Sequence, residues 1–355
     1  MTLNEELSAF VDFIPTIPAE KRYWLIRTKS WEFYDAFRLN NIVAIEHNEV
    51  PLSELRKLKD TYKEDFGLIQ AGIKTIVRSE HEKRATIDNI EEIEIRRSSL
   101  TASQIFKFVF EVKKGDMVLI PSSNSDIVSF GIVNESYVGD FSKEELRKID
   151  TDAILMKRVT WISDLKRFEL DPYLYRMFTA HQAINDVGSY ADVIERSVGD
   201  FFILDDEAHV ILNITNENEI SAFDLFKMGT EILSLIDLIA KEFNIECSSK
   251  DISVTINLNS PGKIDLKSKI KKSTTLLGIL VVLMGGGMQT KSGLTIKSDG
   301  IPGLVKSLND FLDKQQQRDM NEKVFEKYKD KIQVKQPDDV LKLLKQYSDN
   351  KDQSK

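Results

Sequence analysis

The first half of the chain alternates between strand-like and helix-like hydrophobic patterns. Apolar or alternating runs at residues 21–27, 41–46, 117–121, 127–133 and 153–163 predict five strands. Helical patterns lie between and after them, at 31–41, 51–67 and in short segments across 173–194. Residues 67–99 are highly charged and indicate either a helical excursion or a mobile loop. Five strands with helices between them predict a small, curved β-barrel of the α+β class.

The pattern changes after Gly199. The segment 207–214 is predicted as a strand, and strict alternation predicts strands at 251–259, 262–270 and 293–298. The strongest helix of the chain spans 221–243. Ser221 and Asp224 form a capping pattern at its start. We therefore expect a leading helix at 1–20, a first domain at 21–198, a second α+β domain at 199–312 and a helical tail at 313–355.

Composition narrows the class of protein. The 355 residues include 49 Lys and Arg, 57 Asp and Glu, and a single cysteine, Cys247. One cysteine allows neither an internal disulfide nor a thiolate zinc cluster. The first twenty residues lack a basic segment followed by an uninterrupted apolar core, so no secretory signal is visible and a cytoplasmic location is expected.

Charge is distributed unevenly along the chain. Residues 1–200 hold 27 basic and 34 acidic residues, and residues 202–249 hold two basic and ten acidic ones. Residues 250–297 hold eight lysines against Asp251 and Asp265. This window is either a solvated face or a surface for phosphates or lipid headgroups. The lysines that would make such contacts are Lys263, Lys267, Lys269, Lys271 and Lys272.

The segment 274–288 is apolar, is interrupted by Gly278 and ends in three glycines. It is short for a membrane span, which needs about 20 apolar residues. A buried helix with a glycine C-cap is the favoured interpretation. The alternative is a segment that lies in a membrane interface, with lysines at the headgroups.

The sequence holds no complete motif for catalysis. Gln333-Val334-Lys335 matches the Gln-x-Lys element of some nucleases, but no acidic ligand on a preceding strand accompanies it, so the match is interpreted as coincidental. The four histidines lack the spacing of a zinc protease, and no phosphate-binding glycine loop ends in a lysine. We predict a protein that is not an enzyme and that has no catalytic residues, metal or cofactor.

The order of elements in the first domain carries a resemblance. KRYWLIR, a helix, NIVAIE, QIFKFVFEVKKGDMVLIPS, FGIV and KRVTWIS follow one another in residues 21–190. This order resembles the N-terminal domain of Mrr-type restriction proteins, which belongs to the EVE/PUA-like superfamily of small nucleic-acid-reading barrels. The most specific part is 106–122, where an aromatic helix, a Lys-Gly-Asp turn and an apolar strand ending in Pro-Ser occur in sequence.

The resemblance implies a reader that takes one nucleotide, often a modified base flipped out of a duplex, into a pocket at the barrel mouth. An aromatic wall would offset the cost of unstacking, and polar groups would read the base edge. The candidate residues for stacking are Trp24, Trp31, Phe33 and Trp161. Those for edge contacts are Ser122, Ser123 and Asn124, and those for phosphate are Arg27 and Lys29.

These features predict a non-enzymatic recognition subunit of a bacterial restriction or anti-phage system. Its partners would be DNA, possibly with a modified base, and a methylase, helicase or nuclease subunit. A flipped-base pocket needs few phosphate contacts, so the acidic net charge does not exclude it.

Two alternatives stay open. One is a nucleotide-signal sensor whose 274–288 segment perturbs membranes, although membrane association is not favoured. The other is a scaffold whose barrel has lost its ligand, because Thr28-Lys29-Ser30-Trp31 and Glu46-His47 stand where the family usually has a glycine-rich segment and Gly-Trp.

Overall fold

The computed structural model describes residues 14–29, 32–88, 93–149, 153–199, 201–214, 222–242, 244–257, 262–269, 276–277 and 334–335. The chain forms two compact units, each built from helices and a sheet, so the α+β class is confirmed. We call Glu20–Ile194 the half-barrel unit; the second unit combines Met1–Ala19 with Glu195–Lys355.

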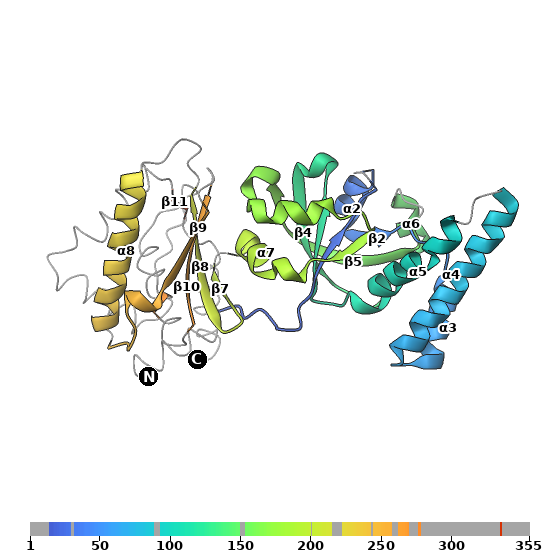
Figure 1. Ribbon diagram of the computed structural model, residues 1–355, viewed down its shortest axis with the longest axis horizontal. Helices are drawn as coiled ribbons and strands as arrows, with labels where there is room; N and C mark the ends of the chain where they lie inside the picture. The colour runs from blue at the N-terminus through green and yellow to red at the C-terminus, as the bar shows by residue number, and fades with distance from the viewer. Residues whose placement is uncertain are drawn as a thin grey trace. The chain divides into compact units, whose positions relative to one another are not determined.

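A curled six-stranded sheet forms the centre of the half-barrel unit (Figure 1). Its strand order is β2-β5-β4-β3-β1-β6, in which β1 and β3 are parallel and every other pair is antiparallel. The strands are β1 (Tyr23–Ile26), β2 (Ile42–Ile45), β3 (Met117–Pro121), β4 (Ile127–Val133), β5 (Leu155–Lys166) and β6 (Ile184–Asp186).

Burial explains the strand patterns. All residues of β1, β2 and β3 are buried, which is why these segments are continuously apolar. The first half of β5 is buried as well, but its second half alternates between exposed and half-buried side chains. A β-bulge separates the two halves, because Phe130 pairs with Ser163 while Gly131 pairs with Trp161, which leaves Ile162 unpaired. The first half of β5 therefore belongs to the core, and its second half lies at the surface.

The highly charged region that the sequence pattern left open is helical. α3 (Leu52–Tyr62) is followed by α4 (Phe66–Asp88) and α5 (Ile93–Phe106), and α5 continues into the π-helix η1 (Lys107–Glu111). A stripe at four-residue spacing faces the interior from α4, and its members are Ile69, Ile73, Val77 and His81. One buried stripe within a polar sequence is the pattern of a surface helix.

Shorter elements complete the half-barrel unit. They are α2 (Tyr34–Asn40), η2 (Ser123–Ser125), α6 (Lys143–Lys148), η3 (Arg167–Glu169), η4 (Pro172–Thr179) and η5 (Gly188–Tyr190). The helix α7 (Ala191–Val198) begins in this unit and ends in the second one. The predicted helix over 181–194 is wrong at its start, where β6 instead pairs with β1. The backbone of β6 completes the edge of the sheet, a long-range pairing that local pattern does not report.

The second unit pairs a sheet with one long helix. The sheet has the order β11-β8-β10-β9, with β7 paired to β8. Its strands are β7 (Phe201–Leu204), β8 (Glu207–Ile214), β9 (Ser253–Asn257), β10 (Gly262–Ser268) and β11 (Val334–Lys335), and its helices are α8 (Ala222–Glu242) and η6 (Ser249–Asp251). Asp205 and Asp206 both have positive φ and form the tight turn between β7 and β8.

Several predicted segments lie outside the described residues. They include residues 1–13 of the leading helix, the strand at 293–298, most of 274–288 and all of the helical tail except Val334 and Lys335. The described part of the predicted leading helix, residues 14–20, is not helical. Thr16 instead forms a parallel bridge with Ile203. Gln333 of the Gln-x-Lys match also lies outside the described residues, and Lys335 of the same match belongs to β11. Among the described helices, none has the length and apolar character that a bilayer crossing requires.

Candidate functional site

Trp24, a predicted stacking residue, is a core residue. Its side chain has no exposed surface, and its indole N–H donates a 2.9 Å hydrogen bond to Asp116 Oδ2. Asp116 also accepts from the backbone N–H groups of Arg22 and Lys113, so it connects β1 to the turn before β3. Trp24 therefore supports the sheet and offers no face to a ligand.

The segment after β1 holds the next group of predicted residues. Lys29 lies over the ring of the buried Phe33 at 5.1 Å and is within ion-pair distance of Glu32 and Glu46. The side-chain hydrogen bond with Glu46 raises the pKa of Lys29. The guanidinium of Arg27 donates to the carbonyl of Phe178. Trp31 lies outside the described residues.

The predicted edge-reading residues form the turn between β3 and β4. Ser122 Oγ accepts a 2.9 Å hydrogen bond from the N–H of Ile127, and Asn124 has a left-handed φ of 53°. Thr28 Oγ1 donates to the carbonyl of Pro121, so this turn lies beside the segment after β1. Ser123 is half-buried in the same turn. The Asn124 side chain is exposed, while its carbonyl accepts from Arg167 Nη1.

Trp161 lies elsewhere, at an open cavity of about 460 Å³ beside β5. Its indole N–H is shielded from solvent and has no acceptor among the described residues. The ring packs on Gly131, where no side chain could fit without displacing it. Other lining residues are Arg38, Asn41, Asn134, Phe141 and Arg158.

A polar chain fixes one wall of this cavity. Tyr34 and Arg38 stand one turn apart on α2. The Tyr34 hydroxyl is 2.7 Å from Ser129 Oγ, and Ser129 donates to Asp164 Oδ1 at 2.6 Å. Arg38 donates two hydrogen bonds to Asp164, and its guanidinium lies over the Trp161 ring at 5.4 Å. The hydrogen bonds from Arg38 and Ser129 lower the pKa of Asp164, whereas burial raises the pKa of Tyr34.

A second arginine lines the same cavity. Arg158 lies 4.3 Å from the centre of the Phe141 ring and forms ion pairs with Glu135 and Glu145. Glu145 is the third residue of α6 and completes a capping box with Ser142. Backbone and side-chain hydrogen bonds from Ser142, together with Arg158, lower the pKa of Glu145 to about 2. Arg158 is thus held in place by two carboxylates, which together more than neutralise its charge.

This arrangement suits a neutral, flat ligand. Both arginines already have carboxylate partners, so neither is available as a bare charge for a phosphate. Arginine planes and aromatic rings both stack on flat heterocycles. The side chains of Asn41 and Asn134 line the cavity, and the Asn134 amide exchanges hydrogen bonds with the Thr160 hydroxyl.

The predicted basic surface of the second unit is largely occupied by internal contacts. Lys263 Nζ donates to the carbonyls of Arg196 and Ser197. Lys267 and Lys269 both lie near Glu207, at 3.3 and 3.5 Å, and attraction to them lowers the pKa of Glu207. Lys271 and Lys272 lie outside the described residues.

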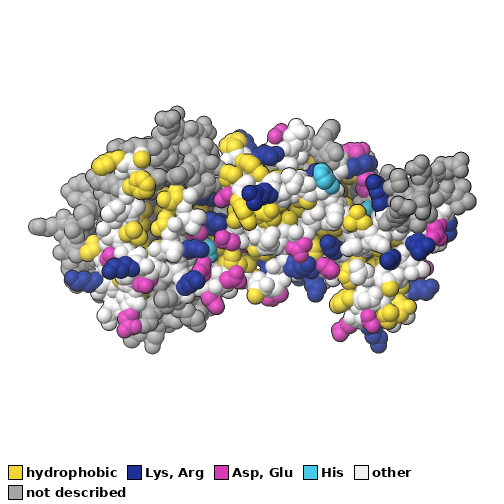
Figure 2. Space-filling view, in the orientation of Figure 1, with side chains coloured by type: hydrophobic (Ala, Val, Ile, Leu, Met, Phe, Trp, Pro, Cys, Tyr) yellow, Lys and Arg dark blue, Asp and Glu magenta, His cyan; other side chains and the backbone are white. Residues whose placement is uncertain are grey.

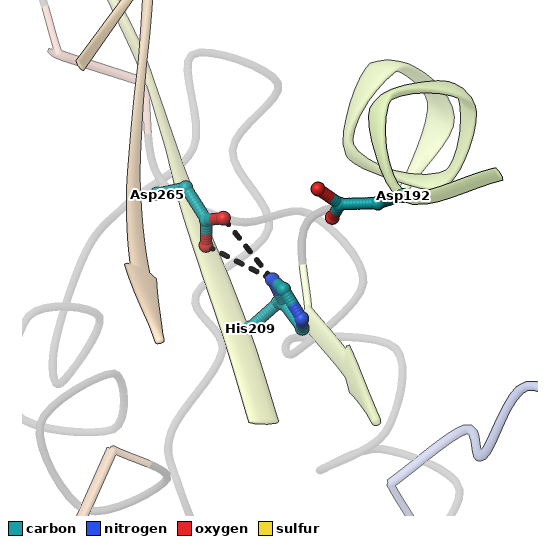
Figure 3. Close-up of side chains that lie close together, drawn as sticks. All are labelled: Asp192, His209 and Asp265. Atoms are coloured by element: carbon teal, nitrogen blue, oxygen red, sulfur yellow. Dashed lines mark hydrogen bonds and ion pairs between the residues drawn. The ribbon is translucent and has the colours of Figure 1, made fainter. Parts of the chain in front are cut away.

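His209 and Asp265 form a buried pair between β8 and β10 (Figure 3). His209 Nδ1 is 3.1 Å from Asp265 Oδ2, and the Phe202 ring stacks on the imidazole at 4.9 Å. Arg196 Nε lies 3.7 Å from the same carboxylate. Asp192, also drawn in Figure 3, belongs to the half-barrel unit. Within either unit alone, the described residues hold no trio of His, Cys, Asp and Glu side chains close enough to share a metal ion.

Comparison with known proteins adds one match. Residues 27–184 match the family model of a domain of unknown function (DUF8426), and this range lies within the half-barrel unit. No curated protein and no solved structure matches the chain.

Of the predicted site residues, Trp161 is the one that lines the cavity. Sequence reasoning missed the residues around it, chiefly Arg38, Asp164 and Arg158. The spacing of Tyr34 and Arg38 on one helical face was a visible signal. Their partner Asp164 lies 126 residues after Arg38, and no local pattern connects them.

Proposed function

We propose that the half-barrel unit is a PUA/EVE-like reader of a single nucleobase, and that the protein is a non-enzymatic recognition subunit of a bacterial restriction or anti-phage system. It would act in the cytoplasm on DNA, together with a methylase, helicase or nuclease supplied by partner subunits. The observation that carries the proposal is the cavity beside β5, which two arginine–aromatic pairs line. The Trp161 N–H is shielded from solvent and has no acceptor among the described residues, so the ring must turn before a ligand can accept a hydrogen bond from it. A buried donor without a partner costs free energy that such an acceptor would recover.

The charge at the cavity supports a base as the ligand in preference to a phosphate, because three carboxylates accompany the two arginines. Asp164, Glu135 and Glu145 pair with the two arginines. A base brings a flat surface and an edge of donors and acceptors without a charge, and it matches this environment. The cavity volume lies within the range of small-ligand sites in proteins.

Binding of oligonucleotides that differ at one central base tests the proposal. Strands with cytosine, 5-methylcytosine, adenine or N6-methyladenine would be titrated by calorimetry and by tryptophan fluorescence. We expect one of these bases to be preferred, and Trp161→Phe, which keeps a ring but removes the N–H, to weaken that preference about tenfold.

Ile162→Val is the matched control, because Ile162 neighbours Trp161 on the same strand but is outside the cavity lining. Its binding should equal that of the wild type. Identical affinity of wild type and Trp161→Phe for every strand would contradict base reading in this cavity. Binding of free nucleosides without any preference among strands would instead favour the nucleotide-signal sensor.

A further inference from the structure

A second surface of the half-barrel unit combines cations with exposed aromatic rings. It follows directly after the exposed half of β5 and is made by η3 and η4. Phe168 and Tyr173 expose 54% and 50% of their surface, which is unusual for large rings. We call it the basic-aromatic surface, and its members are Lys166, Arg167, Phe168, Tyr173, Tyr175 and Arg176. Figure 2 shows Lys and Arg side chains bordered by hydrophobic ones over this part of the unit.

Among the residues that the structure describes, the cations of this surface have no acidic partners. In the described part of the chain, no carboxylate lies within ion-pair distance of Lys166, Arg167 or Arg176. The arginines of the sheet behave differently, because Arg22 and Arg158 each contact two carboxylates. A protein with a net charge of −8 has acidic groups in excess, so three cations that lie close together along the chain and have no carboxylate partner among the described residues indicate an anionic partner.

Local contacts hold these cations in position. Arg167 lies over the Tyr175 ring at 4.7 Å and donates to the Asn124 carbonyl at 3.0 Å. Lys166 and Arg176 lie 5.6 and 5.9 Å from the centres of the Phe168 and Tyr173 rings. These contacts orient the positive charges without neutralising them.

The neighbouring carboxylates act mainly on the backbone. Glu169 accepts a hydrogen bond from the N–H of Lys166, and Asp171 accepts one from the N–H of Tyr173. Asp126 lines the same open cavity, of about 500 Å³, as Lys166, Arg167 and Phe168. Two of the three acidic groups therefore serve as turn and helix caps.

We propose that the basic-aromatic surface binds a single-stranded segment of nucleic acid, with Lys166, Arg167 and Arg176 on phosphates and Phe168 and Tyr173 stacked on bases. Exposed rings between cations are the arrangement that binds unpaired strands, since every base has a flat face. The inference deepens the proposed function and rests on it for the choice of nucleic acid as the partner. Trp161 and Lys166 lie on one strand, with Cα atoms roughly 17 Å apart, so the surface and the cavity can be tested with separate variants.

Fluorescence anisotropy with labelled oligothymidine tests the surface apart from the cavity. The full-length protein would be titrated with a strand of about 15 nucleotides, which suits one single-strand binding site. The double variant Arg167→Gln/Arg176→Gln should lose at least tenfold in affinity, and its dependence on salt concentration should weaken. Phe168→Ala should weaken binding of oligothymidine several-fold and leave binding of an abasic strand unchanged, because that strand has no bases to stack.

Lys57→Gln/Lys74→Gln is the control, since it removes the same charge from the exposed faces of α3 and α4. It should bind like the wild type. An equal loss in both double variants would overturn the inference, as would an unchanged affinity of Arg167→Gln/Arg176→Gln or a preference for the matching duplex. Arg167→Lys/Arg176→Lys, which keeps the charge, should retain most of the binding, and its failure to do so would also count against phosphate contacts.

The two proposals fail separately. Trp161→Phe should bind oligothymidine as the wild type does, because the basic-aromatic surface is intact. Loss of strand binding in the arginine variant, without any base preference in the wild type, supports this surface and contradicts the base reader. Undiminished strand binding in the arginine variant, together with a base preference that needs Trp161, supports the base reader and contradicts the basic-aromatic surface.

Discussion

Lys157 is the residue with the least ordinary environment in the half-barrel unit. It lies on β5 with no exposed surface, and its Nζ donates to the carbonyl of Val112 at 2.7 Å. Val112 caps the C-terminal end of the π-helix η1. Burial lowers the pKa of Lys157 to about 7. The amine is therefore a donor that satisfies a helix end within the core, and its charge is the costly part.

This environment predicts how stability depends on pH. Between about pH 7 and the unfolded-state pKa of about 10.4, the unfolded chain binds a proton that the folded chain does not. The contribution of Lys157 should thus rise with pH across this window, by a few kcal/mol in total. In urea unfolding at pH 7, 8.5 and 10, the free energy of unfolding of the wild type should include this rise. The Lys157→Met variant should lack it.

The exposed variant Lys57→Met provides the comparison, because it removes a lysine that solvent already surrounds. Its stability should follow pH as the wild type does. Parallel curves for the wild type and Lys157→Met would show that Lys157 is not held with a lowered pKa.

At the scale of elements, the bulge in β5 decides where the candidate site lies. Gly131 stands opposite Trp161, and a Cβ at this position would collide with Val159 and approach the Trp161 ring to 2.7 Å. The absence of a side chain lets the indole lie flat against the sheet beside the cavity. The glycine on β4 and the bulge on β5 thus act together to position the Trp161 ring.

Gly131→Ala should therefore destabilise the half-barrel unit by about 1–3 kcal/mol, because the added methyl group must displace Val159 and Trp161. The matched control is Gly67→Ala in α4, where the added Cβ would lie 3.4 Å from the nearest atom, Oδ1 of Asp65. It should be neutral or stabilising by up to about 1 kcal/mol. Chemical denaturation of both variants gives the comparison, and a harmless Gly131→Ala would contradict the packing described.

At the scale of the whole molecule, each unit has its own core. The half-barrel unit buries a cluster that includes Ile26, Val43 and Leu155, and the second unit buries Val210, Leu212 and Ile236. Separate cores predict separate cooperative transitions. The division between the units falls between Ile194 and Glu195, within α7.

Calorimetric unfolding of the full chain should accordingly resolve two transitions. Gly131→Ala should lower the midpoint of one of them and leave the other unchanged, since the substitution lies in one unit. An oligonucleotide that binds the half-barrel unit should raise the same midpoint. A single transition that shifts as a whole in both experiments would contradict independent units.

The sequence alone determined the local elements whose side chains repeat with a clear period. The limits of β3, β4 and β8 agree with those expected from the apolar and alternating runs, and α8 begins and ends within a residue of its predicted bounds. Each of these patterns depends on which side of one element meets the core, and that information is local. The helices α4 and α5 were left open because high charge hid a single buried stripe.

Only the tertiary structure decided which side chains have partners. Trp24 and Trp161 look alike in sequence, yet Trp24 finds an acceptor 92 residues away in Asp116, and Trp161 has none among the described residues. Arg38 finds its carboxylate in Asp164, and Arg167 lacks one in the described chain. Hydrogen bonds and ion pairs across the sheet depend on strand order and register, which distant segments set together. The candidate cavity and the basic-aromatic surface are therefore properties of the fold.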